Sequence, residues 1–175
     1  AILYYSQATR FSRSAGGYFG RASMLFELRK PDLANEILRE AGELNSRTSA
    51  ELSEIAAAYW RGQQFEDAAK AFRVVLERRP LDHQVLLSLA QLYVAQLQQP
   101  EKAQPYIASL IENYPADARG WLLKSAGKSE AECHEALKKY LSLVDRNDPY
   151  ETSMIAQAEA RINVLETQGV GVHKQ

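Results

Sequence analysis

The stretch AAAYWRGQQFEDAAKAFRVVLERRP, residues 56–80, is the clearest part of a pattern in which two apolar stripes flank a polar turn. The first stripe has the spacing of one helix face: Leu52, Ile55, Ala56 and Tyr59. After the turn at Gly62, a second stripe follows at i, i+4 and i+7: Ala68, Phe72 and Val75. Pro80 closes the segment, so the pattern predicts a helix hairpin of about 34 residues.

The same pattern recurs further along the chain. The next copy has both stripes: Leu86, Leu89, Ala90, Tyr93, Ala103, Ile107 and Leu110. Its closing Pro115 lies 35 residues after Pro80, so one residue is inserted, and we place it in QLQQPE, residues 96–101. Pro149 closes a third copy 34 residues later. Helix starts are indicated by a capping box at Thr48 and Glu51 and by an N-cap at Asp117.

Extending the pattern in both directions divides the chain into seven predicted segments. They are the second helix of a truncated preceding repeat at 1–14, repeats at 15–48, 49–82, 83–117 and 118–149, a capping helix at 150–168 and a tail at 169–175. The repeat at 118–149 is degenerate, because its first helix is short. A single helix at the end of such a stack covers its exposed apolar face.

The alternation of small and large residues in the two middle copies resembles the tetratricopeptide repeat. The resemblance covers roughly residues 15–149 and departs from the family pattern at the opening position, where Leu52 replaces tryptophan. It implies an all-α fold, a right-handed superhelical solenoid of antiparallel helix hairpins. The small residues Ala56 and Ala68 allow close helix approach, and larger side chains fill the space beside them.

In solenoids of this family the first helices line a concave groove, and the resemblance implies that partners bind there. The face of each first helix that is not used for packing can be projected from the packed positions. The projection gives these partner-binding candidates: Phe19, Phe26, Trp60, Arg61, Leu87, Gln91, Val94 and Arg119. Trp60 and Arg61 are the strongest, since Trp and Arg anchor many interfaces. The alternative for Trp60 is packing on another hairpin.

Family members that bind the C-terminal tails of heat-shock chaperones carry a clamp of Lys, Asn and Arg on the groove face. The matching positions here are occupied by other residues: Phe19, Ser23, Glu54, Gln84 and Ser88. The missing clamp argues against chaperone tails as ligands. The partner is expected to be another protein or peptide, and self-association is a further option.

Composition excludes several other classes of function. The net charge of −1 and pI of 6.4 do not provide the basic surface that nucleic-acid binding requires. No apolar run approaches the ~18 residues of a membrane span, so membrane insertion is not expected. The single cysteine, Cys133, excludes an intrachain disulfide and suits a reducing compartment such as the cytoplasm, although the bacterial periplasm stays open.

Catalytic, metal and cofactor motifs are not found in the sequence. The three histidines are not spaced as a helical metal pair, and Cys133 is expected to be a packed residue next to His134. The stretch SAGGYFG, residues 14–20, lacks the spacing of a phosphate-binding loop and is expected to be a loop between helices. We therefore expect a protein that is not an enzyme and uses no cofactor.

These observations favour a protein–protein interaction module with a scaffold or assembly role. Because the chain begins at Ala1 rather than Met, we expect it to be a piece of a longer protein. Two alternatives stay open. The chain could be a spacer or self-association segment that uses its apolar start, Ile2 to Tyr5. It could also be an accessory domain of an enzyme or of an envelope or secretion assembly factor.

Overall fold

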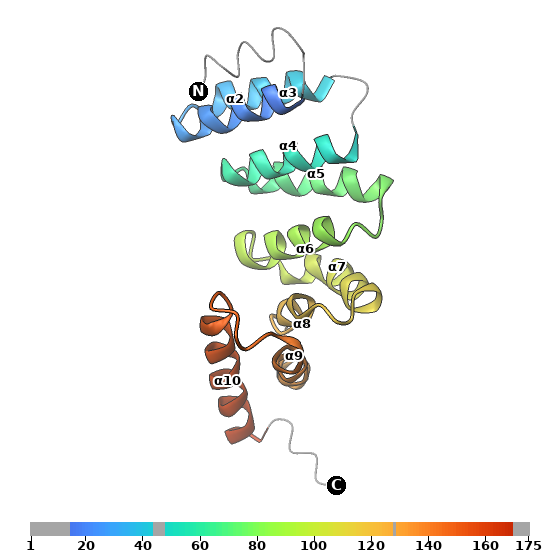
Figure 1. Ribbon diagram of the computed structural model, residues 1–175, viewed down its shortest axis with the longest axis vertical. Helices are drawn as coiled ribbons and strands as arrows, with labels where there is room; N and C mark the ends of the chain where they lie inside the picture. The colour runs from blue at the N-terminus through green and yellow to red at the C-terminus, as the bar shows by residue number, and fades with distance from the viewer. Residues whose placement is uncertain (1–14, 44–47, 128, 170–175) are drawn as a thin grey trace. The chain divides into compact units, whose positions relative to one another are not determined.

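The computed structural model describes residues 15–43, 48–127 and 129–169, and all regular structure in this part is helical, with no β-strand (Figure 1). The elements follow in chain order as α2 Ala15–Glu27, α3 Pro31–Glu43, α4 Ser49–Arg61, α5 Phe65–Arg78, α6 His83–Gln91, the π-helix η1 Leu92–Gln96, α7 Pro100–Asn113, α8 Ala118–Lys124, α9 Glu130–Leu143 and α10 Thr152–Thr167. This confirms the predicted all-α fold. None of the helices in these ranges is long and apolar enough to cross a bilayer.

The chain forms two compact units, Ala1–Val85 and Leu86–Gln175, with the boundary inside α6. In the first unit α2 pairs with α3, α4 pairs with α5, and α2 also contacts α4. In the second unit α8 pairs with α9, α9 contacts α10, and α7 contacts η1 and α8. The predicted helix at 1–14 with its apolar start lies outside the described residues, and the repeat boundaries stay a prediction.

The α4–α5 hairpin forms as its sequence pattern predicts. The backbone N–H of Glu51 donates to Thr48 Oγ1 at 3.2 Å, and the N–H of Thr48 donates to Glu51 Oε2 at 2.8 Å. This reciprocal pair satisfies two backbone donors that the first turn of a helix leaves free. The predicted stripes are buried: Leu52, Ile55, Ala56, Ala68, Phe72 and Val75. Tyr59, the last member of the first stripe, is half-buried.

A short turn closes this hairpin after Arg61. Gln63 adopts a left-handed backbone conformation with φ of 59°, and the N–H of Gln64 donates to the carbonyl of Tyr59 at 2.9 Å, five residues back. This is the bond that ends many helices through a left-handed residue. The α2–α3 turn repeats it, with Arg29 at φ 55° and Lys30 N–H donating to Leu25 O at 2.9 Å.

The inserted residue of the next hairpin is accommodated in η1. There the N–H of Leu97 donates to Leu92 O at 3.0 Å, an i to i−5 bond, whereas α-helical bonds span four residues. The extra residue therefore lies at the end of the first helix, in η1. The sequence pattern places it slightly later, in residues 96–101. Tyr93 in η1 stacks on Tyr106 of α7, with ring centres 6.0 Å apart.

Residues 15–20 of the glycine-rich stretch are helical, so the expectation of a loop is wrong for this described part. Helix α2 begins at Ala15 and includes Gly17 and Gly20. Gly17 is buried. Glycine in a helix interior weakens the helix by up to about 1 kcal/mol. Tertiary packing of the helix can outweigh that local preference, because propensity is only a weak prior.

The second unit ends in a core formed by α8, α9 and α10. Cys133, Leu137 and Tyr140 of α9 pack with Ile155, Ala158, Ile162 and Leu165 of α10. Asp117 caps α8 by accepting the N–H of Arg119 at 2.9 Å, as the sequence predicts. The apolar stripe of α10 is thus covered by α9, and the buried Cys133 is a packed residue.

Candidate partner-binding surface

Three of the predicted partner-binding residues occur together in the first unit, on α2 and at the end of α4. Arg61 is exposed and has no ion-pair partner among the described residues. Trp60 is half-buried, and its ring meets the ring of Phe72 edge to face, with centres 6.2 Å apart and planes at 82°. Trp60 therefore packs partly on its own hairpin and exposes the remainder of its ring.

Phe26 of α2 lies against the turn that follows α4. A Cβ atom placed on Gly62 would come within 2.5–2.6 Å of three atoms of the Phe26 ring. Real Cβ atoms do not approach so closely, so glycine at this position allows the ring to lie on the turn. Phe26 is half-buried there. The contact brings Phe26 next to the segment that carries Trp60 and Arg61.

In the second unit, Gln91 ends α6 and Val94 lies in η1, and both side chains are half-buried. Arg119 is exposed, but its guanidinium is paired with the carboxylate that caps the same helix. Its Nη2 lies 2.8 Å from Asp117 Oδ2, and its Nε donates to Asp117 Oδ1 at 3.0 Å. The hydrogen bond to Asp117 raises the pKa of Arg119. A partner carboxylate would have to compete with Asp117 for this side chain.

Two of the predicted residues are not accessible. Phe19 is only 5% exposed and Leu87 only 2%. Phe19 lies three residues before the buried Ala22, on the same face of α2. Helix α6 is buried on several sides, because the consecutive residues Val85, Leu86 and Leu87 are all buried. The projection of Phe19 and Leu87 onto an exposed face is therefore wrong.

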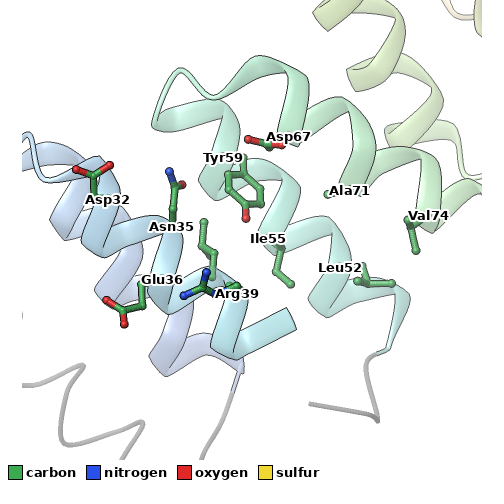
Figure 2. A pocket seen from close by; sticks show the side chains of 11 residues that line it. Asp32, Asn35, Glu36, Arg39, Leu52, Ile55, Tyr59, Asp67, Ala71 and Val74 are labelled. Carbon is green, nitrogen blue, oxygen red and sulfur yellow. The ribbon is translucent and has the colours of Figure 1, made fainter. Parts of the chain in front are cut away.

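A pocket in the first unit was not found by sequence reasoning. It has a volume of about 790 Å³ and lies between α3 on one side and α4 and α5 on the other (Figure 2). Figure 2 shows polar side chains on the α3 side: Asp32, Asn35, Glu36 and Arg39. Two acidic residues at i and i+4, Asp32 and Glu36, were the available signal, but such pairs are usual on solvated helix faces.

The charged and polar contacts at the end of the second unit have a structural role. His134 is 1% exposed, and its Nε2 lies 3.1 Å from Glu166 Oε1, while Lys138 Nζ lies 3.1 Å from the same oxygen. Both contacts lower the pKa of Glu166, and the contact with His134 has the larger effect. The buried Tyr140 hydroxyl donates to Glu151 Oε2 at 2.7 Å. Burial and this hydrogen bond raise the pKa of Tyr140. Together these contacts join α9 to α10 and its N-terminal flank.

These groups pair with one another and are not gathered around a metal site in the described part of the chain. Within the described ranges, no three or more His, Cys, Asp or Glu side chains gather in a way that could hold a metal ion. The groups with shifted pKa in the second unit are accounted for by their neighbours on the same or the next helix.

The comparison with protein families gives a match over residues 59–127, which extend from the end of α4 to just past α8. The matching family is the tetratricopeptide repeat. This segment consists of tetratricopeptide repeats. The match contains Trp60, Arg61, Gln91, Val94 and Arg119. Phe26 lies before it.

Solved structures give the same fold at low sequence identity. A MamA RS-1 double mutant is 18% identical, with a TM-score of 0.60, covering 89% of this chain and 96% of that chain. MamA from residue 41 to its end, from Desulfovibrio magneticus RS-1, is 18% identical with a TM-score of 0.60, covering 88% and 96%. BtubC from P. vanneervenii is 15% identical with a TM-score of 0.61, covering 96% and 80%. A search of curated proteins finds no match.

At these identities the likeness to solved structures extends to the fold alone. The general role comes from the repeats themselves. Stacked helical repeats build extended surfaces that bind other proteins. The tetratricopeptide match therefore supports a protein-interaction scaffold.

Proposed function

We propose that this chain is a protein–protein interaction module that holds a peptide or partner protein on the exposed face of its first helices. The observation that carries the proposal is the Trp60–Arg61 pair at the end of α4. It combines a half-buried aromatic ring with an exposed guanidinium that has no ion-pair partner in the described part of the chain. Trp and Arg are the residues most enriched at interface positions that dominate binding energy.

The contact with Phe72 fits such a role. A ring held edge to face by its own hairpin loses little conformational entropy when a partner covers its other side. Phe26 extends the patch, because it rests on Gly62, directly after Arg61. Gln91 and Val94 supply a half-buried polar and a half-buried apolar side chain in the second unit. The proposed role needs no catalytic residue.

A photo-crosslinking residue at position 61 tests the proposal without disturbing the core. The same residue at position 73 is the control, because Arg73 is exposed on α5, the second helix of the hairpin. In extracts of the source organism, a partner should be crosslinked from position 61 and not from position 73, and mass spectrometry would identify it.

The purified partner then allows a quantitative test. Arg61→Glu should weaken binding at least about tenfold, since charge reversal places a repulsive element in the contact. Arg73→Glu is the matched control and should leave binding unchanged. Crosslinking from position 73 alone, or equal binding by wild type and Arg61→Glu, would show that the partner contacts another face.

A further inference from the structure

The lining of the pocket between α3 and the α4–α5 hairpin does not include Trp60 or Arg61. Its apolar lining comes from three helices: Leu38, Leu52, Ile55, Tyr59, Ala71 and Val74. Leu38, Leu52 and Ile55 are buried, whereas Val74 is an exposed apolar side chain on the wall. The volume of about 790 Å³ is within the range of sites that take small ligands or a few side chains.

Negative charge predominates around this pocket. Three carboxylates, Asp32, Glu36 and Asp67, line it with one guanidinium, Arg39. Asp67 forms an ion pair with Lys70, whose Nζ lies 2.8 Å from Asp67 Oδ1. Asp32 and Glu36, one turn apart on α3, have no ion-pair partner among the described residues. With Arg39 on the same helix, the α3 wall thus keeps a net negative charge next to an apolar floor.

A hydrogen-bond acceptor in the lining also lacks a partner. Asn35 Oδ1 is buried and has no hydrogen bond within the described part of the chain. In Figure 2 the Asn35 side chain stands on the α3 side of the pocket, between Asp32 and Tyr59. A buried acceptor that lacks a donor is unfavourable by about 1–3 kcal/mol. A rotation of the Asn35 side chain that brings Oδ1 to the pocket surface would let an entering N–H donor remove this penalty.

We propose that this pocket binds a peptide segment of a partner protein in which a Lys or Arg lies among aliphatic side chains. The aliphatic side chains would cover Leu52, Ile55 and Val74. The cationic group would lie near Asp32 and Glu36, and the Asn35 side chain would turn so that its Oδ1 accepts an N–H of this group. Charge complementarity selects this occupant, because an acidic or purely apolar segment would leave the carboxylates and the amide oxygen without partners. The site is separate from the surface that carries the proposed function.

Selection from a random library of 12-residue peptides displayed on phage, with the full chain as bait, tests the assignment. Enriched peptides should carry Lys or Arg next to aliphatic residues. A fluorescein-labelled copy of the leading peptide should bind with lower affinity as salt rises, since screening weakens exposed charge pairs. In fluorescence anisotropy, the double variant Asp32→Lys and Glu36→Lys should bind it at least about tenfold more weakly.

The matched control is Glu101→Lys with Glu112→Lys, which reverses two exposed carboxylates on α7 and should leave the affinity unchanged. Asn35→Leu removes the unpartnered acceptor. It should weaken peptide binding severalfold while the melting temperature stays the same or rises, because an apolar group now fills the buried position. Arg61→Glu should not affect this peptide, which separates this site from the proposed one.

Three results would overturn the assignment. The first is the absence of enriched peptides, and the second is enrichment of acidic ones. The third is a leading peptide that binds the Asp32→Lys and Glu36→Lys variant as tightly as wild type. A concentration-dependent dimer that disappears in that same variant would assign the pocket to a second copy of the chain instead.

Discussion

The α4–α5 hairpin and the α6–η1–α7 hairpin share one sequence pattern but differ by one residue where the first helix ends. Positions of the apolar stripes before the turn match at an offset of 34, as in Tyr59 and Tyr93, and those after it at 35, as in Phe72 and Ile107. The left-handed turn residues, Gln63 and Gln98, already differ by 35. The extra residue therefore lies between the last core position of the first helix and the turn.

Backbone hydrogen bonds show how each hairpin closes. In the α4–α5 turn, Gln64 N–H donates to Tyr59 O at 2.9 Å, across five residues. In the other turn, Gln99 N–H donates to Tyr93 O at 2.8 Å, across six. Both turns use the carbonyl of the last tyrosine of the first stripe and a left-handed glutamine. In the second hairpin the backbone between these two residues is one residue longer and forms a π turn. A repeat can thus accept an insertion without a change in either apolar stripe.

Single-residue deletions give the largest expected effect. Deleting Ala57 from α4 rotates the rest of that helix by about 100° relative to its start, so Ala58 and Tyr59 leave the core face. We expect the first unit to lose at least about 3 kcal/mol of stability, as large core defects do. Deleting Ala95 from η1 should convert the π turn to the α4 type and change stability by less than about 1 kcal/mol.

Hydrogen exchange followed by mass spectrometry would check both deletions, because it reports on each hairpin separately. Loss of protection in α4 and α5 after the Ala57 deletion is the expected result. Protection of α7 should persist after the Ala95 deletion. If α7 loses protection as well, the extra residue is needed for packing and the two hairpins are not equivalent at this position.

Gly62 provides a second difference between the hairpins. Its backbone, at φ of −78°, suits any residue, so Gly62→Ala tests only the space that Phe26 occupies. We expect a loss of about 2 kcal/mol, typical of overpacking, measured by urea denaturation. In the second hairpin the C-cap is Leu97, and the residue before it, Gln96, has an exposed side chain. Gln96→Ala should therefore be nearly neutral.

A double-mutant cycle sharpens this test. In a Phe26→Ala background the ring is gone, so adding Gly62→Ala should no longer destabilise the protein. A loss that persists without the ring would mean that the turn itself, rather than the contact with Phe26, requires glycine.

Sequence spacing predicts the parts of this fold that depend on which residues share a helix face. The stripe Leu52, Ile55 and Ala56 is buried, and the capping box at Thr48 forms, because both follow from helix periodicity alone. The exact position of the inserted residue could not be predicted from the sequence. A spacing of 35 residues shows that one residue is added, but it does not show where the backbone bulges. The likeness of the two turns became visible only through their backbone bonds.

The binding surface was harder to predict for a related reason. An error of one position rotates a side chain by about 100°, and a helix buried on several sides has no single packing face to project from. Leu87 on α6 illustrates the second case. The role of Phe26 depends on Gly62, which lies 36 residues away in the sequence, so no local pattern indicates the contact. The pocket beside α3 likewise requires three helices to be placed together.

The smallest expected effect concerns what the two turns have in common. Gln63 and Gln98 hold left-handed backbones at φ of 59° and 53°, a conformation that disfavours side chains by about 1–2 kcal/mol. Glycine removes that strain but also gains freedom in the unfolded chain, so Gln63→Gly and Gln98→Gly should each stabilise the protein by only about 0.5–1 kcal/mol. Gln64→Gly, at φ of −90°, is the control and should be neutral or destabilising. Equal gains in urea denaturation would mean that both turns carry the same strain despite the inserted residue. A gain at Gln63 alone would mean that the π turn has already relieved it in the second hairpin.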